Sequence, residues 1–174
     1  MICPPRWLLT PLAMALALVL LLVGPDPGNA QIQAHGDLGP GASMVRSLES
    51  LRDLDHQSWQ VVAYRQEATA AKPSLRLRLV GFPGKVRLDH PTSLEVRSGR
   101  RQWQLVDITL SQPQLAADGR AAAAEFDLTP LLAELDQDRP LRLTLPGVFR
   151  ELPVPPFVVA EWRRLPDWGP GDQP

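Results

Sequence analysis

Leu75-Arg-Leu-Arg-Leu-Val-Gly-Phe-Pro-Gly-Lys-Val-Arg-Leu-Asp89 is the stretch of this 174-residue chain that decides its fold. Leucine alternates with arginine up to Leu79, which is the period-two pattern of a strand with one buried face. The alternation resumes on even-numbered positions after Pro83-Gly84, and a one-residue change of parity moves every apolar side chain to the other face. The chain is therefore predicted to reverse or bulge between Gly81 and Gly84, where Pro-Gly is a turn signal.

A second pair of strands is predicted at 94–98 and 101–105, on either side of Gly99-Arg100. A two-residue type II′ turn has glycine at its first position. This turn would place Val96 opposite Trp103, Leu94 opposite Leu105, and Glu95 opposite Gln104. Turn chemistry and apolar register agree, so a hairpin is expected here.

Further strands are predicted at 58–64, 121–127 and 141–145, and a final one at 157–162. Residues 152–156 are expected to be extended and to lie at a sheet edge, because proline cannot donate to a ladder of hydrogen bonds. A short helix is predicted at 129–135, with Thr129 as its N-cap, Pro130 at its first position and Leu131, Leu132 and Leu135 buried.

A helix is also considered near the amino terminus, capped by Ser43, with Met44, Leu48 and Leu51 on one face. Short strands at regular spacing predict an all-β fold, an antiparallel β-sandwich of Ig-like type, with a small barrel as the alternative. The 19 prolines, about twice the average usage, disfavour a helical bundle.

The chain is close to neutral, with 18 Lys and Arg against 19 Asp and Glu. This balance argues against binding to nucleic acid or to a membrane surface through charge alone. Residues 1–30 are interpreted as a signal peptide, with Arg6, an apolar run at 7–23 and a cleavage site after Ala30. An uncleaved anchor is the alternative. Cleavage would remove Cys3, the only cysteine, and with it any disulfide.

The predicted organisation after the signal peptide is a flexible lead-in at 31–42, one β-rich domain at 43–165 and a disordered tail at 166–174. Several segments resemble a cyanobacterial family of short exported proteins of unknown function. They are 51–55, 58–65, 79–84, 88–91 and 152–162. The resemblance implies an extracytoplasmic location, either the periplasm or the thylakoid lumen. It implies no activity and no functional residues.

Candidate catalytic groups are few. His35, His56 and His90 lack the spacing of a metal site, so no metal is predicted, and no phosphate-binding glycine loop or dinucleotide motif indicates a cofactor. Asp53 and Asp55 lie near His56, and Asp89 precedes His90. A hydrolase built on these groups is the less favoured hypothesis, because Asp-His-Pro is also typical of a turn. The chain is predicted not to be an enzyme.

Two binding hypotheses remain. In the favoured one the chain is an accessory module that binds another protein or a membrane-associated complex. The binding surface would be the basic face formed by Arg76, Arg78, Lys85 and Arg87. If Pro83-Gly84 makes a tight hairpin, Arg78 would face Asp89. In the alternative, Trp59, Trp103, Trp162 and Tyr64 line a face that binds carbohydrate or another small ligand.

Overall fold

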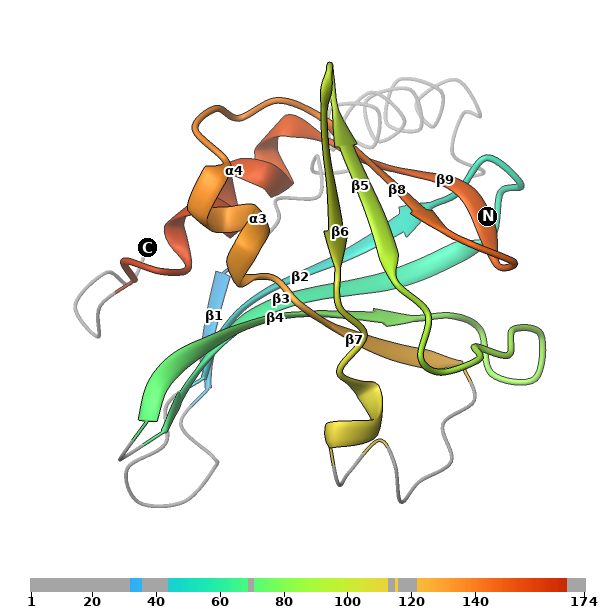
Figure 1. Cartoon of the computed structure of the whole chain (residues 1–174), viewed down its shortest axis with the longest axis horizontal. Coiled ribbons are helices and arrows are strands. Elements are labelled where there is room, and N and C mark those ends of the chain that lie inside the picture. The colour runs from blue at the N-terminus through green and yellow to red at the C-terminus, as the bar shows by residue number, and fades with distance from the viewer. Residues whose placement is uncertain (1–31, 36–43, 69–70, 113–114, 116–121, 169–174) are drawn as a thin grey trace, which may run out of the picture.

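A computed structural model describes residues 32–35, 44–68, 71–112, 115 and 122–168, which form two antiparallel sheets (Figure 1). One sheet has the strand order β1-β2-β3-β4-β7: β1 (Ile32–His35), β2 (Met44–Arg52), β3 (Ser58–Ala68), β4 (Ala71–Val80) and β7 (Ala123–Asp127). The other has the order β6-β5-β8-β9: β5 (Leu94–Ser98), β6 (Arg101–Leu105), β8 (Leu141–Leu145) and β9 (Phe149–Val154). The predicted all-β sandwich is confirmed.

The core lies between the two sheets, whose strands cross steeply in Figure 1. Trp59 packs edge-on against Phe149, with ring centroids 4.9 Å apart, so the largest side chain of β3 contacts β9. Backbone hydrogen bonds also join the sheets at two corners. Asp107, just after β6, bridges to Phe126 of β7, and the Leu54 amide donates to the Glu151 carbonyl of β9.

The stretch Leu75–Asp89 contains the predicted strand, which is part of β4, and the predicted turn. However, the segment after the turn is not the strand that pairs with β4. Gly84 has a φ of 81° and the Lys85 amide donates to the Phe82 carbonyl, as in a type II turn with Pro83 first. Residues 86–88 do not pair with β4, so the predicted register of Arg78 opposite Asp89 is wrong. Strands β3 and β7 occupy both edges of β4, which leaves no edge for the returning segment.

The β5–β6 hairpin has the predicted register throughout, including Leu94 opposite Leu105, Val96 opposite Trp103 and Glu95 opposite Gln104. Gly99 has a φ of 58°, as the first central residue of a type II′ turn requires. Strand β9, which contains Pro153, lies at the edge of its sheet as expected.

The predicted helix after Ser43 is wrong, because Met44–Arg52 is strand β2, paired with β3 along its whole length. Its core-facing row includes Ser47 and Glu49, which lie opposite Ala63 and Val61 of β3. Because these two residues on the buried side are polar, the sequence does not show the apolar alternation of a strand. The apolar residues Met44, Leu48 and Leu51 are instead spaced as on one face of a helix.

The predicted final strand at 157–162 is also wrong, because Pro156–Arg164 is helix α4. Val158, Val159 and Trp162 are buried, at the i, i+1 and i+4 spacing of one helical face. Proline lies in the first turn and two arginines lie in the last, as a helix favours at each end. A short run of apolar residues does not by itself distinguish a buried strand from a helix.

The predicted helix at 129–135 is confirmed as α3 (Thr129–Glu134), with Pro130 in its first turn and Leu131 and Leu135 buried. The predicted N-cap is wrong, since Leu128 holds that position. The Asp127 carboxylate instead accepts a hydrogen bond from the Thr129 amide.

The segments predicted to flank the domain are described only in part. Strand β1 falls within the predicted lead-in, and Arg65 donates to the carbonyls of Pro166 and Trp168 in the predicted tail. The predicted signal peptide lies outside the described residues. Within the described part of the chain, no helix has the length and apolar character needed to cross a membrane.

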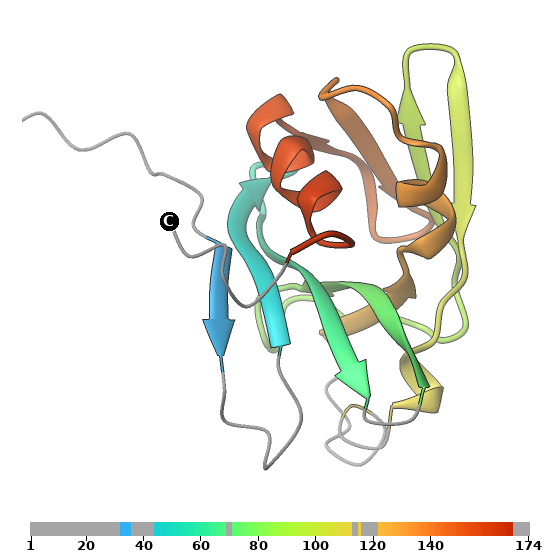
Figure 2. The same cartoon turned by 90° about the vertical axis from the view of Figure 1, so that its left-hand side faces the viewer.

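Helix α4 lies over β2 (Figure 2), and two carboxyl groups meet at this contact. The Ser47 hydroxyl donates to the Glu161 carboxylate at 2.6 Å. Burial raises the pKa of Glu161, although the Ser47 hydrogen bond and the charge of Arg164 oppose the increase. Burial also raises the pKa of Glu49, and the charge of Glu161 adds to the increase.

Replacing Glu161 by Gln should remove part of the pH dependence of stability. The raised pKa means that the folded state binds a proton more readily than the unfolded state does. The stabilising contribution is therefore complete below the ordinary value of 4.5 and is lost as pH rises through the raised pKa. In urea unfolding, the stability advantage of Glu161→Gln over the wild type should be largest at neutral pH and shrink on acidification. A difference that grows on acidification would contradict this.

Candidate functional site

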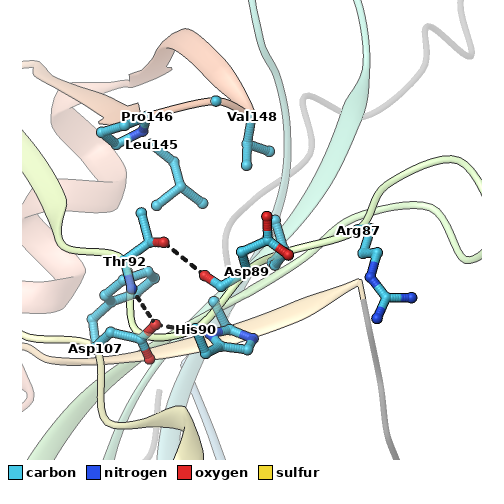
Figure 3. Close-up of a pocket in the computed structure, with 12 residues that line it drawn as sticks. Arg87, Asp89, His90, Thr92, Asp107, Leu145, Pro146 and Val148 are labelled. Carbon is cyan, nitrogen blue, oxygen red and sulfur yellow. Dashed lines mark hydrogen bonds and ion pairs between the residues drawn. The ribbon is translucent and has the colours of Figure 1, made fainter.

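A pocket of about 100 Å³ opens where the loop after β4 meets β7 and the β8–β9 turn (Figure 3). Its floor is apolar, and its polar groups come from the loop and from Asp107. The lining residues include Asp89, His90, Asp107, Phe126, Leu145 and Val148. The volume is somewhat less than that of the roughly 150 Å³ cavity that accepts benzene in an engineered protein. The pocket is therefore suited to one small chemical group.

Asp107 holds the polar wall in place. One of its carboxylate oxygens accepts hydrogen bonds from His90 Nδ1 at 2.8 Å and from the Thr92 amide at 2.9 Å. The other accepts from the amide and hydroxyl of Thr109, at 2.9 and 2.5 Å. Burial alone would raise the pKa of Asp107, but these hydrogen bonds outweigh it and keep the pKa below its ordinary value. The carboxylate is therefore ionised and accepts at both oxygens.

This arrangement fixes the tautomer of His90. Nδ1 faces an ionised carboxylate, so Nδ1 carries the proton and donates it. In the neutral ring Nε2 is then an acceptor. Carboxylate–histidine pairs of this kind orient the ring for binding or for proton transfer.

The sequence identified His90 but paired it with the wrong carboxylate. Asp89 lines the pocket, and its side chain makes neither a hydrogen bond nor an ion pair with His90 or any other described residue. Asp107 is the actual partner, from a segment 17 residues further along the chain. The one local signal is Asp107-Ile-Thr109, since aspartate often accepts from the amide two residues on.

The other candidate catalytic group, Asp53, Asp55 and His56, does not form a site. Asp53 is buried and accepts from the amides of Asp55 and Gln57 and from the Trp59 indole, each at 2.9 Å. His56 is exposed, and its ring makes neither a hydrogen bond nor an ion pair with Asp53. These hydrogen bonds show Asp53 acting to close the β2–β3 turn.

Of the four basic residues predicted to form one face, two are half-buried and belong to an ionic network. Arg76 and Arg78 bind the fully buried Glu125 carboxylate, with N–O distances of 3.0 and 2.8 Å. The Tyr64 hydroxyl also donates to Glu125, at 2.5 Å. Burial, followed by this hydrogen bond, raises the pKa of Tyr64 to about 12.

Lys85 and Arg87 lie instead in the loop after β4 and are exposed. The shared face of two paired strands does not exist, because residues 86–88 do not pair with β4. Lys85 Nζ lies 5.6 Å from the ring centroid of Phe82, a residue that is 62% exposed. Neither cation forms an ion pair within the described residues.

The aromatic residues suggested as a ligand-binding face are all buried: Trp59, Trp103, Trp162 and Tyr64. The hypothesis of a module that binds carbohydrate through these exposed rings is therefore wrong. Among the described residues, no group of three or more potential metal-ligating side chains comes together.

Residues 30–165 match the model of a family described as protein of unknown function, DUF3122. Neither the curated proteins nor the solved structures contain a match to the chain.

Proposed function

We propose that this chain, which belongs to the DUF3122 family of proteins of unknown function, is a non-catalytic exported module that binds a membrane-associated protein. The proposed location is the periplasm or the thylakoid lumen of a cyanobacterium, after cleavage near Ala30. The proposed partner presents an acidic surface with an apolar centre. The observation that carries the proposal is the loop containing Phe82, Lys85 and Arg87.

This docking loop joins an exposed aromatic ring to two uncompensated cations. Exposed large apolar side chains that are rimmed by polar groups are typical of interaction sites. Aromatic residues and arginine are enriched at the centres of protein interfaces. In Figure 1 the loop between β4 and β5 projects from the body of the sandwich. It is therefore accessible to a large partner.

A protein partner is favoured over a lipid surface because the loop carries only two cations. Electrostatic binding to anionic lipid provides about 1 kcal/mol per basic residue, and lipid-binding clusters commonly contain four or more. Two cations beside an aromatic ring suit recognition of a few carboxylates on a protein surface.

The test introduces a photo-crosslinking phenylalanine analogue at position 82 of the tagged protein. It should crosslink a specific membrane protein, which mass spectrometry would identify. The purified partner should then bind the wild type with an affinity that decreases as salt increases. The combined variant Phe82→Ser, Lys85→Glu, Arg87→Glu should lose most of this binding.

A matched control changes the same types of side chain elsewhere: Phe157→Ser, Arg97→Glu and Arg100→Glu, all at exposed positions. This control should bind like the wild type. Reversal of Arg76 and Arg78 is unsuitable, because these residues compensate Glu125. Equal loss in both variants, or binding to anionic vesicles without protein, would overturn the proposal.

A further inference from the structure

The pocket beside the docking loop presents two unused hydrogen-bond acceptors. In the neutral ring of His90, whose Nδ1 donates to Asp107, Nε2 is an acceptor. The carboxylate of Asp89 is the second, and no described residue donates to it or to Nε2. A ligand that satisfies both must itself be a donor.

The charges of the lining residues also favour a cationic ligand. Asp107 and Asp89 each bring a negative charge to the pocket, and the ionised Asp107 is buried beside His90. Arg87 is the one cation among the lining residues, and Figure 3 shows it at the outer side of the pocket, directed away from His90. A small anion would therefore meet a carboxylate, whereas a cation would be attracted.

The wall opposite these groups is apolar. Val148 is half-buried and packs against the core, and Phe126 and Leu145 lie behind it as buried core residues. Figure 3 shows Leu145 and Val148 across the pocket from Asp89 and His90. A ligand that enters would place a polar head at one wall and a short apolar chain against the other.

We propose that this pocket binds a primary alkylammonium group. The ammonium is held between the Asp89 carboxylate and Nε2 of the neutral His90 ring, and a chain of a few carbons lies against Val148. An ammonium has three donors, so it can satisfy both acceptors and retain one bond to water. The group could belong to a free small amine or to a lysine side chain, which share this chemistry.

The experiment titrates the protein with n-butylammonium at constant ionic strength, and follows the His90 ring nitrogens and the amides of Gly147 and Val148 by NMR. We expect saturable shifts with a dissociation constant on the order of 1–10 mM, as for a ligand of about five heavy atoms. Two probes serve as controls. Tetramethylammonium has the charge without N–H donors, and acetate has the opposite charge. Neither should give saturable shifts.

Asp89→Asn should weaken n-butylammonium binding at least about fivefold while the fold is retained, because the Asp89 side chain has no contact to lose. Asp55→Asn removes the same charge at an exposed site and should bind like the wild type. A capped lysine amide distinguishes the sources: binding equal to that of butylammonium indicates a peptide lysine, and exclusion indicates a free amine. Saturation by acetate or tetramethylammonium, or unchanged binding in Asp89→Asn, would overturn the proposal. Neither outcome depends on the docking loop or its partner.

Discussion

Glu125→Gln is expected to reduce the free energy of unfolding by about 3 kcal/mol. Glu125 is fully buried, and its carboxylate is the counter-ion of two arginines. Removing one partner of a buried ion pair typically costs 3–5 kcal/mol, because the remaining charge is left uncompensated. The Arg76 and Arg78 side chains are 19% and 28% exposed, so water screens them in part and the lower end of the range applies.

Urea unfolding of the two proteins measures this loss. The matched control is Glu151→Gln, which removes the counter-ion of Arg142 at the surface. That change should cost less than about 1 kcal/mol, as exposed ion pairs generally do. Similar costs for the two variants would show that burial does not matter at Glu125.

Tyr64 provides a second measurement, because it is the only tyrosine in the chain. Its pKa of about 12 depends first on burial and then on Glu125, which accepts its hydrogen bond and repels the phenolate. Alkaline titration followed by tyrosinate absorbance should show a lower pKa in Glu125→Gln. The pKa should stay above its ordinary value because the ring remains buried. An unchanged pKa would mean that Glu125 does not act on Tyr64.

Trp162→Ala is expected to destabilise the protein by about 3–5 kcal/mol, the usual cost of removing a buried aromatic side chain. Trp162 lies on the buried face of α4, with Val158 and Val159. Total stabilities of domains are about 5–15 kcal/mol, so this single change would remove a large part of the stability. Thermal and urea unfolding would both detect it.

Phe157→Ala is the control within the same helix. Phe157 is 51% exposed and should change stability by no more than about 0.5 kcal/mol. The pair also tests the conformation of this segment. A strand covered on both sides would bury both aromatic rings, and both changes would then be costly. Comparable losses would therefore contradict the helix.

Local patterns in the sequence predicted the parts of the fold that depend on local interactions. The β5–β6 hairpin was predicted with its register, because Gly99 sets the turn and the alternating residues on both sides agree. The strand around Leu77 was also predicted, but its neighbour was not. Pairing with β7 depends on contacts 47 residues apart, such as the one between Arg78 and Glu125.

The periodicity of apolar residues was misleading in two segments. In β2, Ser47 and Glu49 face the core, so the apolar alternation of a strand is missing. In α4, the adjacent valines Val158 and Val159 are both buried, which is also typical of a strand covered on both faces. The pocket itself was not predicted, because its groups come from segments far apart in the sequence, and His90 was considered only in the less favoured hydrolase hypothesis. His90 was identified, but Asp107 reaches it only because the chain leaving β6 crosses to the edge of β7. Sequence separation gives no indication of that crossing.

The pairing of β4 with β7 also has a consequence for how the chain reaches its folded state. During synthesis or export, β2, β3 and β4 emerge well before residues 123–127, so the outer edge of β4 has no partner for that time. An unpaired edge is a template for association with other chains. The Arg76 and Arg78 side chains on that strand oppose such association until Glu125 arrives. We therefore expect slow folding, limited by this long-range closure, and the greatest tendency to aggregate before it is complete.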